Sequence, residues 1–192
     1  DLVDTIRVTD GDLVELDLAQ YQGAEAKLEV EASSFVDVID SVFTQADLVM
    51  LQAADDVTGI INQGDVALDD QDVALSLDKL TNDGGTVTVS DLAINTQAEF
   101  NALVGTVWVT TIDITTAGTL VLDVASALVA AQKDNTTDHD GVLIHTNGVV
   151  TVNGSAADMT AAIVLEALVF TNVDTLVLTD GGTVTAADLI TI

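Results

Sequence analysis

Most of the side chains with which this chain could do chemistry are aspartates. The sequence holds 26 Asp and only 6 Glu among its 32 acidic residues. The short Asp carboxylate suits calcium sites in turns, because Ca²⁺ takes about six to eight oxygen ligands in flexible geometry. Calcium is therefore the one cofactor we expect. Its candidate ligands form two clusters, Asp134, Asp138 and Asp140 in one, and Asp65, Asp69, Asp70 and Asp72 in the other.

The cluster around Asp138 contains only the second half of an EF-hand loop. Thr136 stands where the first acid of such a loop belongs, and Asn147 stands where the bidentate Glu should be. We therefore exclude an EF-hand at this place. A solvated, charged turn is the alternative interpretation of both Asp clusters.

The residues for acid–base and nucleophilic catalysis are scarce. His139 and His145 are the only histidines, and the chain has no Cys. The flanking acids favour a surface role for His139, although a site of two His and one carboxylate across a hairpin is an alternative. No Gly-x-Ser-x-Gly nucleophile elbow occurs, and no spacing singles out a pair of Asp. We expect that the chain is not an enzyme.

The net charge excludes one class of partner. Four Lys and Arg against 32 acidic residues leave a charge of −28, which repels nucleic acid and acidic membranes. The 48% of hydrophobic residues supplies a core, unlike a solvated acidic tail. No apolar run reaches the length of about 18 residues that a membrane span needs, so we expect no transmembrane segment.

The same composition indicates where the protein works. The absence of Cys and the scarcity of Lys fit a secreted or cell-surface protein, and a cytoplasm kept at high salt is the alternative. The chain begins at Asp1 without an initiator Met, which we interpret as removal of a leader or excision from a longer protein.

Short strands alternate with short helices along the chain. Thr44, Thr96, Asp123 and Ser155 each precede an Ala- and Leu-rich stretch, as helix N-caps do. Trp108 lies in one of the strand-like segments and is expected in the core or at an interface, with a ligand-stacking role as the alternative. The β-branched segments that predict strands are 5–9, 86–89, 106–110, 119–122, 149–152 and 175–179.

One segment occurs twice. Residues 83–92 and 180–189 agree at eight of ten positions and begin with Asp-Gly-Gly. This pattern predicts a tight turn in which Gly takes a positive φ, followed by a strand. The copies lie 97 residues apart, so either a duplicated half-domain or scattered rungs of an irregular solenoid explains them.

Both ends of the sequence read as strands, at 2–8 and at 187–192. A free β-branched end strand is what strand addition to a second copy requires. The chain has no Pro and few Lys, the two residues that commonly blunt sheet edges. An edge strand within the chain's own sheet is the alternative for each end.

The segments 83–92 and 153–159 resemble the repeats of large, acidic, Cys-free secreted bacterial surface proteins, of the adhesin, surface-layer and RTX type. The resemblance implies a β-rich extracellular structural protein. It does not extend to the RTX calcium repeat, because Gly84-Gly85 is followed by Thr-Val-Thr and the Asp comes only at Asp91.

We therefore expect one mainly β domain over 1–192 with short interleaved α-helices. It would be a β-solenoid or β-sandwich-like fold, with a duplication into halves at about 1–95 and 96–192 as the alternative. The expected function is self-assembly into an extracellular surface layer, filament or matrix. Strand edges would join copies while cations, including divalent ones, screen the acidic surface. The alternative is a calcium-stabilised adhesion or ligand-binding module of a larger surface protein.

Overall fold

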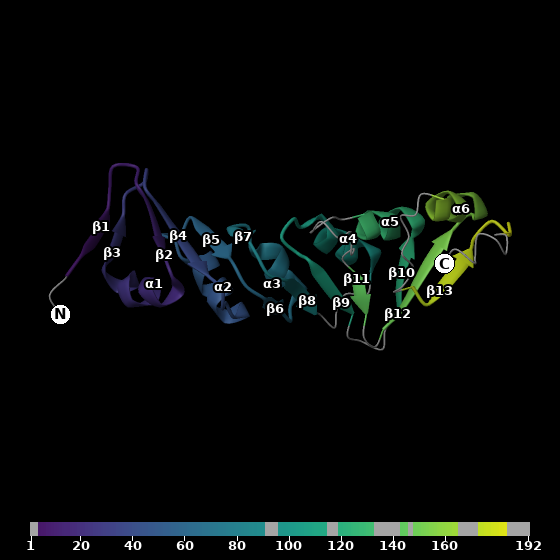
Figure 1. The fold of residues 1–192 in the computed structure, drawn as a ribbon, viewed down its shortest axis with the longest axis horizontal. Coiled ribbons are helices and arrows are strands. Elements are labelled where there is room, and N and C mark those ends of the chain that lie inside the picture. The colour runs from purple at the N-terminus through teal and green to yellow at the C-terminus, as the bar shows by residue number, and fades with distance from the viewer. Residues whose placement is uncertain are drawn as a thin grey trace. The chain divides into compact units, whose positions relative to one another are not determined.

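A computed structural model describes residues 4–90, 96–114, 119–132, 143–145, 148–164 and 173–183 of the chain. In these residues the order strand, strand, helix occurs six times in succession and ends with a further strand (Figure 1). The strands are β1 (Ile6–Val8), β2 (Leu13–Leu16), β3 (Leu28–Val30), β4 (Phe35–Asp40), β5 (Gly59–Asn62), β6 (Val66–Leu68), β7 (Leu80–Asn82), β8 (Val87–Ser90), β9 (Thr111–Ile114), β10 (Thr119–Asp123), β11 (Leu143–His145), β12 (Val149–Gly154) and β13 (Thr175–Leu178). The helices are α1 (Leu18–Ala24), α2 (Gln45–Ala53), α3 (Gln71–Ser76), α4 (Gln97–Gly105), α5 (Val124–Gln132) and α6 (Ala156–Val164), and a 3₁₀ turn at Glu25–Lys27 follows α1.

The strands are joined in parallel wherever the described residues define a register. Ile6 lies beside Leu28 in β3, and Asp37 of β4 lies beside Gly59 of β5, each pair 22 residues apart. Parallel neighbours need a crossover connection. Here each crossover contains a helix of six to nine residues, so one strand–strand–helix repeat brings the chain back beside itself.

The chain divides into two compact units. The first comprises residues 1–68 and 72–87, and the second comprises 69–71 and 88–192. The first unit contains the sheets β1-β3 and β2-β4-β5-β7. The second contains the strands β8, β9 and β11 side by side, and the three-stranded sheet β10-β12-β13.

Each unit buries one face of its strands against its helices. In the first unit, Val36 and Val38 of β4 are fully buried, and α1 packs against that strand. In the second, alternate residues of two strands, Leu120 and Leu122 in β10 and Val150 and Val152 in β12, are buried under α5. This period of two is the pattern that a half-buried strand requires. Among the helices of the described residues, none is long and apolar enough to cross a membrane.

The predicted interleaving of short strands and helices is confirmed, but the proportion of helix to strand is higher than predicted. Helices and strands contribute similar lengths, so the fold is mixed α/β and not mainly β. The parallel pairing also differs from a β-sandwich, whose sheets are antiparallel. The sequence patterns predicted the four nine-residue helices but missed α1 and α3, because helices of seven and six residues are too short to show a clear periodic signal.

The strand predicted at 106–110 is wrong. Thr106 is the C-cap of α4, and the N–H of Val109 donates to the Thr106 carbonyl at 3.2 Å, which closes a turn. The strand begins only at Thr111. Trp108 and Val109 are nevertheless 7% and 0% exposed, so the predicted core position of Trp108 is confirmed. Burial of Trp108 and Val109 explains part of the strand-like composition of this segment, whereas Val107 is exposed.

The capping predictions for two helices are confirmed. Thr44 and Asp47 form a reciprocal capping box at the start of α2, and Thr96 and Glu99 form one at the start of α4. In each, the Thr hydroxyl accepts the N3 N–H while the acid accepts the N-cap N–H. Such boxes satisfy two N–H groups that a helix start otherwise leaves free.

The Asp-Gly-Gly copies differ in detail. In the first copy the second glycine, Gly85, has a φ of 72°, and β8 follows it as predicted. In the other copy the first glycine, Gly181, has the positive φ, 66°. The strand predicted after Gly182 and the terminal strand at 187–192 lie outside the described residues. The duplication of half-domains stays a prediction.

Candidate functional site

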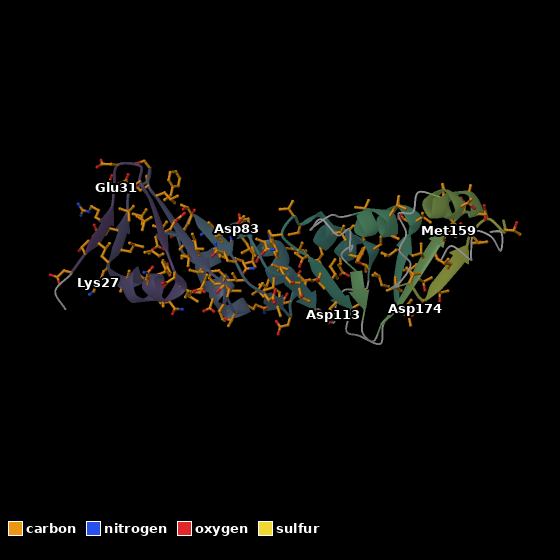
Figure 2. The ribbon with its side chains drawn as sticks, in the orientation of Figure 1. Lys27, Glu31, Asp83, Asp113, Met159 and Asp174 are labelled. Carbon is orange, nitrogen blue, oxygen red and sulfur yellow. The ribbon has the colours of Figure 1, made fainter. Side chains whose placement is uncertain are left out.

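Aspartates at the ends of strands bind backbone N–H groups of the neighbouring repeat. Asp40 accepts the N–H of Leu18, the first residue of α1, at 3.3 Å, and Asp180 accepts the N–H of Ala156, the first residue of α6, at 3.2 Å. Asp174, labelled in Figure 2, accepts the N–H of Val150 at 2.8 Å. The pairs lie 22 to 24 residues apart. Short polar side chains such as Asp commonly make hydrogen bonds of this kind to backbone N–H groups.

Asp123 connects three elements of the second unit. It ends β10, and its carboxylate accepts the N–H of Ser126 at 2.7 Å and the side-chain amide of Gln97 at 2.8 Å. The Asp123 N–H in turn donates to the Gln97 side chain at 2.7 Å. The hydrogen bond from the Ser126 backbone is the main cause that lowers the Asp123 pKa, so this carboxyl is ionised at neutral pH.

A hollow of about 630 Å³ lies beside Asp123, at the carboxyl ends of β10 and β12. Ligands of open parallel sheets bind at this edge, and the volume falls in the usual range for ligand pockets. The first turns of α5 and α6 supply most of its wall. The lining residues are Asp123, Val124, Ala125, Leu128, Asn153, Gly154, Ser155, Asp158, Ala161 and Thr179.

Gly154 allows α5 to approach the end of β12 closely. A Cβ at this position would lie 2.4 Å from Cγ2 of Val124, closer than real Cβ atoms approach. Met159, labelled on α6 in Figure 2, lies 3.4 Å from the same position and is buried. The close packing of Val124 and Met159 at the apolar floor of the hollow is therefore possible only because Gly154 has no side chain.

The polar groups of the hollow are mainly acceptors. Among the described residues that line it, Asp123 and Asp158 are charged and none is Lys, Arg or His. The Ser155 hydroxyl donates to Oδ2 of Asp158 at 2.6 Å. In the described part of the chain, no donor reaches the buried Oδ1 of Asn153. The surroundings favour a ligand that brings donors or positive charge.

A second hollow, of about 350 Å³, lies on the other side of α5. Gln97, Asn101, Val104 and Gly105 of α4 form one wall, and residues of α5 form the other. Asp123 and Ala125 line both hollows. The helices α4, α5 and α6 are neighbours in this order, and small residues between them leave two grooves that meet at the start of α5.

The predicted calcium ligands fall into two groups. Asp134, Asp138 and Asp140 lie outside the described residues, as does His139. Asp65 accepts the N–H of Thr86 at 2.7 Å and so fastens two turns of the first unit. Asp69 and Asp70 precede α3, and Asp72 lies in its first turn. Within the described ranges, no three His, Cys, Asp or Glu side chains gather as metal ligands would.

Sequence reasoning missed the Asp123–Gln97 connection and the hollow beside it. A signal was present, because the apolar strand residues 120–122 run directly into Asp123. An Asp at the carboxyl end of a parallel strand, directly before a helix, marks this edge of the sheet. Comparisons with protein-family models, with curated proteins and with solved structures produced no match.

Proposed function

We propose that the chain is a secreted structural module that assembles with copies of itself, through parallel strand edges, into a surface layer, filament or matrix. The role is structural and not catalytic. The fold would be an irregular solenoid in which each strand–strand–helix repeat adds strands to those of the repeat before it.

The free edges of two sheets support this proposal most directly. Among the described strands, β2 has β4 as its single neighbour, and β13 has β12. Leu13 of β2 is 53% exposed and Val177 of β13 is 40% exposed. Both sheets are parallel, so a β13 strand that adds to β2 of another copy continues the pairing already present. Because the two edges differ, this contact is heterologous and can repeat indefinitely.

The acidic surface supplies a means of control. Glu15 of β2 lies beside Asp37 of β4 in the register, so an incoming acidic chain meets like charges at this edge. Added salt shortens the range of such repulsion to about 10 Å at 0.1 M. Divalent cations screen it further. Assembly would therefore require salt or calcium, as exists outside many cells.

Light scattering and electron microscopy of the purified chain test the proposal. We expect ordered polymers in salt with millimolar calcium, and dispersed chains in low salt with a chelator. Leu13→Lys should prevent polymers, because a charge on the edge strand blocks pairing. Val49→Lys is the matched control, since Val49 is 44% exposed on α2 and the charge change is the same.

Chains that stay monomeric at high concentration in every salt would rule out assembly. If calcium raises the unfolding temperature of such monomers, the alternative of a calcium-stabilised adhesion module is favoured. If Leu13→Lys forms polymers as well as the wild type does, the chain self-assembles, but not through the edge strand β2.

A further inference from the structure

We propose that the two grooves beside α5 bind lysine side chains of a basic segment in a partner protein. The larger groove lies between α5 and α6, and the smaller one lies between α4 and α5. This interaction is separate from the assembly of copies through strand edges.

Charge complementarity identifies the partner as basic. Asp123 borders both grooves, and Asp158 borders the larger one. Both side chains are exposed at the surface. None of the described residues that line either groove is positively charged, and the whole chain carries −28. An acidic partner would be repelled from this surface at long range, whereas a cationic one is attracted.

The shape of the larger groove favours lysine among cationic groups. Val124, Leu128 and Ala161 provide an apolar floor, and the carboxylate of Asp158 stands at its side. A lysine stem covers apolar surface along its methylene groups while the ammonium stays at the polar rim. A bare metal ion would leave that floor exposed, and the described residues hold no group of three metal-ligating side chains.

The hydrogen bonds around Asp158 leave room for an ammonium donor. Oδ2 accepts from the Ser155 hydroxyl at 2.6 Å, and a carboxylate accepts more than one donor at each oxygen. Asp123 has fewer open acceptor positions than Asp158, because one of its oxygens accepts the Ser126 N–H and the other the Gln97 amide. Asp158 is therefore the ammonium partner in the larger groove, while Asp123 contributes charge to both grooves.

Isothermal titration calorimetry with the full chain at physiological ionic strength tests this proposal. The probe is the peptide acetyl-Gly-Lys-Gly-Lys-Gly-amide. One matched peptide carries norleucine at both lysine positions, which keeps the stem and removes the charge. Another carries 2,4-diaminobutyrate, which keeps the ammonium and shortens the stem. We expect binding of the lysine peptide and at least about tenfold weaker binding of each of the others.

Three variants of the protein complete the experiment. Asp158→Asn should weaken the lysine peptide about tenfold or more, because a charge-assisted hydrogen bond is lost. Ala161→Leu should weaken it by filling the groove without a change of charge. Asp55→Asn is the control, since Asp55 is an exposed aspartate of the first unit and the charge change is the same. Far-ultraviolet circular dichroism checks that α6 is intact in each variant.

Equal affinity of wild type, Asp158→Asn and Ala161→Leu would overturn the proposal, because it would show unspecific attraction to the acidic surface. So would equal binding of the norleucine or diaminobutyrate peptide. If 1,5-diaminopentane binds and the lysine peptide does not, the ligand of the grooves is a free diamine, and the proposal of a basic partner protein is wrong. None of these outcomes depends on whether the chain forms polymers.

Discussion

The side-chain amide of Asn62 donates to Oδ1 of Asn82 at 2.8 Å, across the parallel pair β5-β7. The same nitrogen lies 2.5 Å from the carbonyl oxygen of Gly64 and 3.4 Å from that of Gly84. Asn62 is fully buried. One amide thus satisfies acceptors from two successive turns of the chain, and it holds those turns in register.

Asn62→Ala should lower the free energy of unfolding by about 2–3 kcal/mol, because it leaves buried acceptors without a donor. Asn62→Asp should cost more, since it places a carboxylate among carbonyl oxygens. Asn82→Ala is the control, because water reaches that half-buried position. Urea denaturation measures all three variants. An Asn62→Ala variant as stable as wild type would show that the amide does not join the turns.

Gly85→Ala should destabilise the protein strongly. Gly85 has a φ of 72°, and an added Cβ would lie 2.3 Å from the carbonyl carbon of Gly64. Both the backbone conformation and the close approach therefore exclude a side chain, and we expect a loss of more than about 2 kcal/mol. Gly23→Ala, in α1 with open space around it, should be neutral or stabilising. Thermal unfolding measures the melting temperature of both variants. Similar melting temperatures would show that position 85 accepts a side chain as readily as position 23.

Removing a helix-capping hydroxyl should destabilise the protein less than the substitutions of Asn62 and Gly85. Thr96→Ala removes the hydroxyl that accepts the Glu99 N–H at the start of α4, and should cost about 1 kcal/mol. Thr96→Ser keeps the hydroxyl and should cost much less. Chemical denaturation compares the pair. If the two substitutions were equally costly, the methyl group of Thr96 and not its capping bond would matter.

The free energy of unfolding should fall in acid, because the carboxylates of Asp123 and Asp180 become protonated. Hydrogen bonds from the backbone, of Ser126 for Asp123 and of Gly182 and Ala156 for Asp180, lower the pKa of both carboxyls below the ordinary value of 3.8. The pKa of each carboxyl is lower in the folded protein than in the unfolded one. The two carboxylates therefore stabilise the fold fully at pH values above their pKa in the unfolded protein. This stabilisation is lost as pH falls through the folded value.

Asp180→Asn should therefore narrow the difference in urea midpoint between neutral pH and about pH 3. Its amide oxygen still accepts the N–H groups, but it no longer titrates in this range. Asp55→Asn controls for the change in net charge. An unaltered difference in the Asp180→Asn variant would mean that this carboxylate does not link folding to protonation.

The parts of the fold that sequence reasoning found are local. A capping box joins residues three positions apart, as Thr44 and Asp47 do. Each Asp-Gly-Gly turn has one glycine with a positive φ, as predicted, although it is Gly85 in the first copy and Gly181 in the second. Such features depend on the few residues around them, so composition and spacing predict them. The strand predicted at 106–110 is wrong because Thr106 ends a helix instead. Burial accounts for the apolar Trp108 and Val109, whereas the apolar Val107 is exposed.

The sequence alone determined four of the six described helices, five of the thirteen described strands, the burial of Trp108 and the strongly acidic composition of the chain. The tertiary structure decided which strands are neighbours and that they are parallel. It also decided that Asp180 caps Ala156, 24 residues away, and that Asp123 and Asp158 border one hollow. These relationships join residues from different repeats, whose contact depends on the length and path of each crossover and not on any local pattern.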